Sequence, residues 1–253
     1  MIKFRDQLFT FCNSEGSERY DPIFNDWSAL KSSVDSSNVA VVKGEIYAVQ
    51  VNTINQSTTI TKYNVELCRW EIVNLSFDQD CRVNSCVVAA GRHLYMIGGW
   101  KTPHTCFAEC NRFDTVEKKW EEIAGMQEER GGHTGVATRE KIFVVGGVSR
   151  GKSLKSSEMY DISTNKWQLF QCLNVSRYFG SMVQLNGKLY VLGGLKKSNV
   201  NELSVECFDT AEDKWIQKTT IPVKSISAAH NSFIGCVLRL SKGVLDELSV
   251  IEV

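Results

Sequence analysis

The apolar residues of this chain gather in short runs, and no long stretch shows the period of an amphipathic helix. Three runs share one form, in which β-branched or aromatic residues lead into a pair of glycines, at residues 94–99, 142–147 and 189–194. Short runs of this composition, bounded by turn residues, are typical of buried strands. Paired glycines at a strand end suit a point where backbones approach closely or φ becomes positive. The pattern predicts an all-β chain.

A second pattern recurs in phase with the glycine pairs. In five places an aromatic residue is followed by Asp or Asn and, six residues later, by tryptophan: 20–27, 63–70, 113–120, 160–167 and 208–215. Successive tryptophans lie 43, 50, 47 and 48 residues apart. A fixed period near 50 indicates one supersecondary unit copied around an axis. Because these residues recur in every copy, we interpret them as architecture rather than catalysis.

The fourth copy shows how each unit is expected to be built. We place its strands a to d near residues 134–138, 141–145, 157–161 and around Trp167. Asp161 would open the turn between strands c and d, where its carboxylate accepts backbone N–H bonds. Trp167 would pack between neighbouring units. An arginine also lies 16 residues before the first glycine of each pair, at Arg82, Arg130 and Arg177.

Together these residues resemble the kelch repeat, whose pattern continues from the tryptophan through Met and Arg to the next Gly-Gly. The match is nearly complete in residues 126–147, MQEERGGHTGVATREKIFVVGG. The resemblance implies a β-propeller of four-stranded antiparallel blades. The ends of the chain depart from the pattern: Gln50-Val51 and Cys12-Asn13 replace glycine pairs, and Val34 replaces an arginine.

Repeat counting predicts a single propeller of six blades, the first and last incomplete. The expected blades are residues 1–30, 38–72, 84–122, 132–169, 179–217 and 226–253. The first would supply strands b to d, unless residues 1–4 pair across the closure. The last would stop inside strand c, where residues 247–250 repeat residues 202–205. An incomplete ring leaves unpaired strand edges. Either the chain is a fragment of a longer protein or its closure is irregular, and both alternatives stay open.

Composition excludes several classes of protein. The 253 residues have a formal net charge of +0, which argues against nucleic-acid binding by bulk phosphate neutralisation. No run has the length of a membrane span, and the N-terminus does not read as a signal peptide. The cysteine count of 9 is odd, which fits a reducing compartment, so we expect a cytoplasmic protein.

One group of metal-binding residue types needs weighing. His104, Cys106 and Cys110 lie close in sequence, near His93, but they lack the paired spacing of a zinc site. We expect structural cysteines, because free cysteine behaves as a small hydrophobe in protein cores. Redox sensing by Cys106, on the expectation that it lies in an exposed loop, is the alternative.

The candidate binding site lies in the loops, where function concentrates on a repeat scaffold. The loops after the glycine pairs all carry cations, and the repeated arginines are expected at the same rim. The candidate partner-binding residues are Arg82, Trp100, Lys101, His104, Arg130, Arg150, Arg177, Lys196 and Lys224. A cationic face with one exposed tryptophan would suit an acidic or phosphorylated protein segment. The alternative is that these are solvated loops whose arginines pair locally with acids such as Glu128 or Glu129.

Catalysis is not expected, because the chain has no G-x-S-x-G elbow, no P-loop and no triad pattern among its histidines. We expect no metal or other cofactor. Within the kelch family the chain is most similar to the C-terminal propeller of kelch-like proteins, whose BTB and BACK domains bind cullin-3. That resemblance implies substrate recognition for a ubiquitin ligase, with BTB and BACK domains absent from this chain. Actin binding is the alternative function, and a kelch-propeller enzyme a less favoured one.

Overall fold

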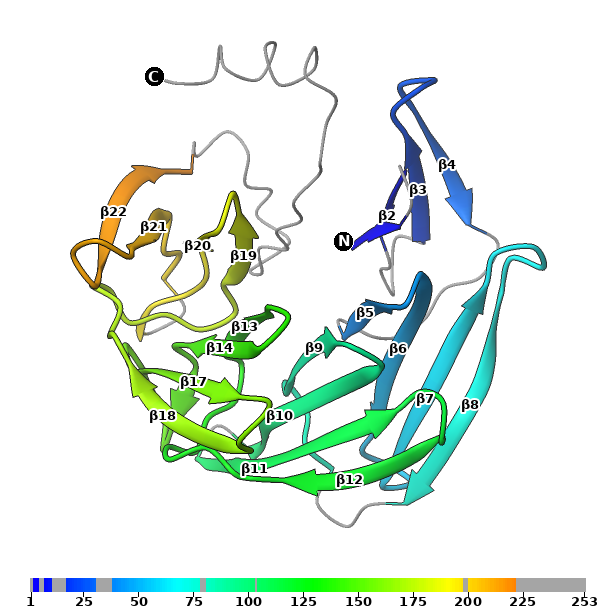
Figure 1. Ribbon diagram of the computed structural model, residues 1–253, viewed down its shortest axis with the longest axis horizontal. Coiled ribbons are helices and arrows are strands. Elements are labelled where there is room, and N and C mark those ends of the chain that lie inside the picture. The colour runs from blue at the N-terminus through cyan, green and yellow to red at the C-terminus, as the bar shows by residue number, and fades with distance from the viewer. Residues whose placement is uncertain are drawn as a thin grey trace.

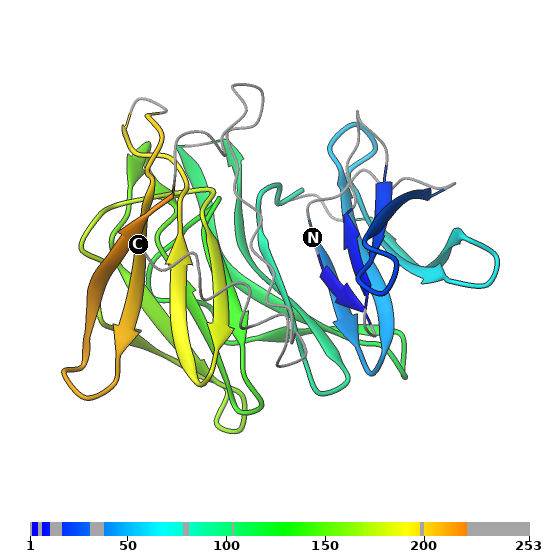
Figure 2. The ribbon, with the colours of Figure 1, turned by 90° about the horizontal axis from the view of Figure 1, so that it is seen from above.

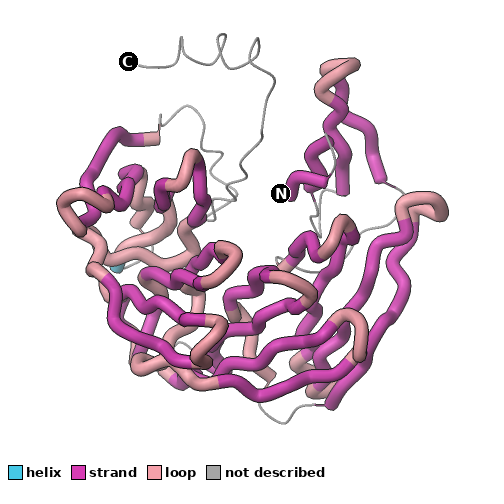
Figure 3. Tube along the Cα trace, in the orientation of Figure 1, coloured by secondary structure: helices cyan, strands magenta, loops and turns pink. Residues whose placement is uncertain are grey.

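The computed structural model describes residues 2–4, 7–10, 17–30, 38–77, 81–102, 104–197 and 200–221. In this part of the chain the regular structure consists of strands, with no α-helix, and the prediction of an all-β fold is confirmed. Five four-stranded antiparallel sheets follow one another around a common centre (Figures 1 and 3). Each sheet is one blade, with strands a to d taken in chain order.

The strands of blades 1 to 3 have the following bounds. Blade 1 contains β1 (Ile2–Phe4), β2 (Gln7–Thr10), β3 (Ser17–Asp21) and β4 (Asp26–Leu30). Blade 2 contains β5 (Val39–Val42), β6 (Glu45–Asn52), β7 (Ser57–Asn64) and β8 (Arg69–Phe77). Blade 3 contains β9 (Cys86–Ala90), β10 (His93–Thr102), β11 (Thr105–Asp114) and β12 (Lys119–Ile123).

Blades 4 and 5 complete the described part of the ring. Blade 4 contains β13 (Thr134–Ala137), β14 (Lys141–Val145), β17 (Ser157–Asp161) and β18 (Lys166–Phe170). The strand positions expected for this repeat are thus confirmed. A two-stranded hairpin, β15 (Val148–Ser149) and β16 (Lys152–Ser153), forms its b–c loop. Blade 5 contains β19 (Ser181–Leu185), β20 (Lys188–Leu192), β21 (Ser204–Asp209) and β22 (Lys214–Thr220).

The strands run between two faces of the ring (Figure 2). Strands β5, β9, β13 and β19 lie on the inside, whereas β8, β12, β18 and β22 lie on the outside (Figure 1). Because the strands within a blade are antiparallel, the a–b and c–d turns share one face. The b–c loops and the d–a connections share the other, which we call the loop face.

Blade 1 is more complete than the sequence suggested. Residues 2–4 form an inner strand that pairs antiparallel with β2, so the blade has strands a to d rather than b to d alone. The expected last blade, residues 226–253, lies outside the described residues, as do Cys12-Asn13 and Val34. The count of six blades therefore stays a prediction.

The repeated Asp closes the c–d turn in the way its position predicts. The Asp161 carboxylate accepts hydrogen bonds from the backbone N–H groups of Ser163 and Thr164, at 3.0 and 2.9 Å. Asp114 and Asp209 make the same bonds in blades 3 and 5. These bonds satisfy donors that would otherwise have no partner in a tight turn. The turn is thus fixed locally in each copy.

The tryptophans of blades 4 and 5 join each blade to the preceding one. Trp167 of blade 4 packs into a core cluster with Cys110, Ile123 and Met126, and its indole Nε1 donates to the Ala124 carbonyl at 2.8 Å. Trp215 of blade 5 donates to the Gln171 carbonyl at 2.8 Å. Each indole therefore binds the chain that leaves the preceding blade, which confirms the expected packing of Trp167 between units.

Candidate functional site

The three repeated arginines do not lie on an exposed rim. Arg130 is 0% exposed, and its Nη1 donates to the carbonyls of Gly146 and Ser156 at 2.8 and 3.0 Å. Its Nη2 pairs with the buried Glu158 carboxylate at 3.0 Å. A cation in this position cannot reach a partner, so its assignment to the binding surface is wrong. Its bonds instead tie the d–a connection to strands b and c of blade 4.

Arg177 and Arg82 occupy the same interior position in blades 5 and 3. Arg177 is 1% exposed, donates to the Gly193 and Ser204 carbonyls, and pairs with buried Glu206 at 2.6 Å. Arg82 is 6% exposed and donates to the Glu109 carbonyl at 2.8 Å and to the Asn111 side chain. The expectation that these side chains contact a partner is corrected for the same reason, because all three arginines at this offset bond to groups inside their own blade.

A sequence signal for these pairs existed but was missed. Glu158 and Glu206 each lie two residues before the aromatic that opens the c–d turn, and Asn111 takes that place in blade 3. In the second repeat, where Val34 replaces the arginine, Thr61 stands at the position of the acid. The arginines thus face an acid in blades 4 and 5 and an amide in blade 3, whereas the repeat without the arginine has a threonine there, which is the pattern of an internal pair.

Trp100 is also placed differently from the expectation. Only 9% of it is exposed, and its backbone pairs with Val83. Val148 and Leu195 follow their glycine pairs at the same offset, are buried, and pair in the same way with Gly131 and Tyr178. The Trp100 ring lies 5.5 Å from the Phe179 ring, centroid to centroid. The side chain therefore fills a buried slot common to three blades instead of standing on the surface.

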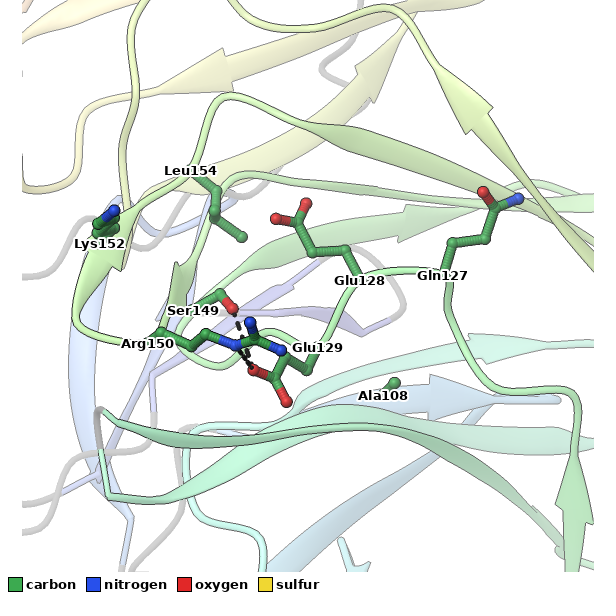
Figure 4. A pocket seen from close by; sticks show the side chains of 8 residues that line it. All are labelled: Ala108, Gln127, Glu128, Glu129, Ser149, Arg150, Lys152 and Leu154. Carbon is green, nitrogen blue, oxygen red and sulfur yellow. Dashed lines mark hydrogen bonds and ion pairs between the residues drawn. The ribbon is translucent and has the colours of Figure 1, made fainter.

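The loop face retains a pocket of about 490 Å³ beside blade 4 (Figure 4). Its walls come from the d–a connection into blade 4, from the β15–β16 hairpin and from strand β11. The lining residues are Ala108, Gln127, Glu128, Glu129, Ser149, Arg150, Lys152 and Leu154. Part of the predicted cationic loop thus borders a concavity, and the acids Glu128 and Glu129 line it as well.

The charges of this pocket are not equally available. Glu128 is held by Arg130 at 3.2 Å and by the Ser156 hydroxyl. Glu129 accepts from Arg150 Nε at 2.9 Å and from the Ser149 hydroxyl at 3.4 Å (Figure 4). The Arg150 side chain is nevertheless 81% exposed, and Lys152 is exposed as well. Cations are therefore the groups that this pocket presents most freely to a partner.

The other predicted loop residues lie around this face. Lys101 and His104 are exposed at the turn between β10 and β11. The His104 ring lies against Gly151 of the neighbouring loop, so close that a Cβ there would stand 2.6 Å from its Cε1. Lys196 pairs with Glu202 at 2.6 Å. Lys224 lies outside the described residues.

The cysteines near these loops are buried. Cys106 is 6% exposed rather than lying in an open loop, and its Sγ donates to the Val148 carbonyl at 3.1 Å. Burial raises the pKa of its thiol, which lowers the thiolate fraction that redox chemistry requires. The redox-sensing alternative is therefore not supported. Among the described residues, no three His, Cys, Asp or Glu side chains are arranged to hold a metal ion.

No helix in the described part of the chain is long and apolar enough to span a membrane.

Known proteins similar to this chain carry kelch repeats. A family model described as "KLHDC2/KLHL20/DRC7 Kelch-repeats domain" matches residues 36–239. Kelch-like protein 15 of Danio rerio is 28% identical over 163 residues, which cover 56% of this chain and 27% of the relative. Kelch-like protein 35 of Mus musculus is 28% identical over 142 residues, covering 56% of this chain and 23% of the relative. The chain spans about a quarter of the length of these relatives.

Two further similarities extend over more of the chain. Kelch repeat protein C2 of Vaccinia virus (strain Western Reserve) is 27% identical over 188 residues, covering 73% of this chain and 34% of the relative. A solved structure titled "Structure of YjhT" superposes with a TM-score of 0.69, covering 85% of this chain and 82% of that chain. At 15% identity, this likeness concerns the fold alone.

Proposed function

Because the chain belongs to the kelch-repeat family, we propose that it is a non-enzymatic protein-interaction module that captures a protein partner on its loop face. The observation that carries this proposal is the pocket beside blade 4, where Arg150 and Lys152 are exposed at a concavity of about 490 Å³. Loops held by a rigid scaffold are the usual place for recognition.

The partner in this proposal presents an acidic or phosphorylated segment. With the three arginines buried, the exposed cations of the face include Arg150 and Lys152 at the pocket and Lys101 on the adjacent blade. Arginine binds carboxylate and phosphate through two parallel N–H donors, and Arg150 can leave Glu129 because an exposed ion pair contributes only about 0–1 kcal/mol. A partner carboxylate would therefore compete with Glu129 for this guanidinium.

In cellular terms, the proposed role is substrate recognition within a kelch-like ubiquitin ligase adaptor. Support comes from the similarity to kelch-like proteins 15 and 35. In that family the BTB and BACK domains bind cullin-3, so the contribution of this chain would be substrate capture. Actin binding is the alternative function, and the experiment must distinguish it from substrate capture.

Quantitative capture from a lysate tests the proposal. The baits are the wild type, an Arg150→Ala/Lys152→Ala variant, and a Lys166→Ala/Lys188→Ala control that removes two exposed cations at the opposite face. We expect the first variant alone to lose the specific partner, and added salt to weaken the capture of that partner. Equal recovery by all three baits would contradict the proposal. Co-sedimentation of the wild type with actin filaments would instead favour the cytoskeletal function.

A further inference from the structure

In blades 2 to 4, the residues paired across strands b, c and d at one level of the sheet form a row that faces the next blade. In blade 3 the row contains Tyr95, Arg112 and Glu121, which are consecutive register partners on strands b, c and d. Tyr95 packs in one cluster with Ile142 and Tyr160 of blade 4, which shows where the row points. The same register positions in the other blades can therefore be compared directly.

The rows of blades 2 and 3 close their seams with polar groups. In blade 3, Arg112 Nε donates to Glu121 at 2.7 Å, the guanidinium hydrogen-bonds the Tyr95 hydroxyl, and Tyr95 is 1% exposed. In blade 2 the row holds Tyr47, Lys62 and Glu71. The Tyr47 hydroxyl donates at 2.9 Å to Glu45, two residues earlier on strand b, and Lys62 pairs with the same acid at 3.0 Å. The aromatic ring is covered in both blades.

The row of blade 4 lacks this covering. Its register positions hold Phe143, Met159 and Gln168, so the tyrosine hydroxyl, the cation and the acid are all missing. Phe143 is consequently half-buried, where Tyr95 and Tyr47 are buried. Beside it lies a pocket of about 450 Å³ in the seam between blades 4 and 5.

The walls of this seam pocket are mainly apolar. One side is aromatic and consists of Phe143, Phe170 and Phe208. The ring centroid of Phe170 lies 5.2 Å from that of Phe143 and 4.6 Å from that of Phe208. Met159 and Leu189 complete the apolar lining. The a–b turns and Thr210 form the mouth, so the pocket opens on the face opposite the pocket with Arg150.

We propose that the seam pocket binds a small, uncharged aromatic molecule. Its volume lies in the range of roughly 300–1,000 Å³ that is usual for ligand sites. The phenylalanine edges and the Met159 thioether favour an aromatic ring over a saturated one. At the mouth, the exposed side chains of Gln184 and Thr210 make no hydrogen bond within the described residues and are free to bind one polar substituent. Glu140 and Lys141 stand there with opposite signs, which gives no net attraction for an ion.

The test transplants the row of blade 3 into blade 4. The variant Phe143→Tyr/Met159→Arg/Gln168→Glu recreates the closed seam, and benzyl alcohol is the probe, followed through the methyl NMR signals of Met159 and Leu189. We expect saturable shifts of the Leu189 signal in the wild type and at least tenfold weaker binding in the variant. Benzoate, the charged counterpart, should bind the wild type at least tenfold more weakly than benzyl alcohol.

A second variant keeps the proposal testable if the triple variant does not fold. Thr210→Ile places at the mouth the residue that Ile162 provides one blade earlier, and it should also weaken binding of benzyl alcohol. Absence of saturable shifts in the wild type would overturn the proposal. Equal affinity in wild type and a folded variant, or tighter binding of benzoate, would overturn it as well.

Discussion

Arg130 and Glu158 form an ion pair in which both side chains are 0% exposed, with 3.0 Å between Nη2 and Oε1. Glu158 also accepts hydrogen bonds from the backbone N–H groups of Gln127 and Glu128, at 2.7 and 3.1 Å. The pair therefore fixes the d–a connection that forms one wall of the loop-face pocket. Folding of the blade and shaping of the candidate binding site depend on the same two residues.

Breaking this pair should destabilise the protein strongly. Arg130→Ala leaves the Glu158 carboxylate buried without its cation, and removal of one partner of a buried pair costs roughly 3–5 kcal/mol. Chemical denaturation of Arg130→Ala and Arg177→Ala measures this cost. Lys152→Ala is the control, because its side chain is exposed and should change the free energy of unfolding by less than about 0.5 kcal/mol. Wild-type stability of both arginine variants would contradict the burial.

Loss of Trp100, which lies outside the repeat signature, should destabilise the protein as much as loss of a signature tryptophan. Trp167→Ala and Trp215→Ala each empty a site between blades, at an expected cost of about 3–5 kcal/mol. Trp100→Ala should also destabilise, by a cost of the same order, because its ring fills the slot of Val148 and Leu195 and contacts Phe179. Thermal melting of the three variants checks this prediction. A Trp100→Ala variant that melts at the wild-type temperature would contradict the burial of Trp100.

Gly146 should tolerate no side chain. Its φ is +65°, and an added Cβ would lie 2.3 Å from the Arg177 carbonyl oxygen, which accepts a 2.8 Å bond from Gly147. Gly91 has a similar φ of +61° but open space around the Cβ position. Gly91→Ala should therefore cost about 1 kcal/mol for its backbone conformation alone. Denaturation curves should show a clearly larger loss for Gly146→Ala, and equal losses would contradict this packing.

Stability should fall in acid partly because of His133. This side chain is 7% exposed, and neither ring nitrogen has a hydrogen-bond partner within the described residues. Burial, and then the charge of Arg130, hold the pKa of His133 well below its usual range. The folded state thus keeps His133 neutral, whereas the unfolded chain binds a proton as pH falls below its pKa of about 6.5. The contribution of His133 to stability is therefore complete above about pH 6.5 and is lost as pH falls below it.

The measurement is the free energy of unfolding between pH 7.5 and pH 5. The His133 contribution should decline by up to about 1.4 kcal/mol per pH unit below about pH 6.5. His93, whose pKa is also lowered by burial, adds a slope of the same sign. The informative comparison is therefore His133→Ser, which copies Ser85 from the equivalent place in blade 3. This variant should lose less stability in acid, and identical slopes would rule His133 out.

The repeat markers predicted the scaffold because each records a local requirement of one blade. The bounds of β14 and β17 follow from the glycine pair and from the Asp161 turn, which act within a few residues. The inner strand of blade 1 could be raised only as an alternative, because residues 2–4 have no repeat marker and are recognised as a strand only through pairing with β2.

The site was harder to predict, because spacing does not reveal on which side of the backbone a residue points. Arg130 and Arg150 are both cations of one loop region, yet the first is buried and the second is 81% exposed. The acids that explain Arg130 and Arg177 lie 28 and 29 residues further along the chain. Their recurrence at Glu158 and Glu206 was the available signal, and it required comparison of strand c between repeats.

Arginine footprinting with phenylglyoxal tests the central claim most directly, on the free protein and on the complex recovered by capture. We predict that Arg150 reacts in the free protein and becomes protected in the complex, whereas Arg82, Arg130 and Arg177 stay unreactive in both until the protein is unfolded. Reaction of the three buried arginines in the native protein, or an Arg150 that reacts equally with and without the partner, would contradict the account.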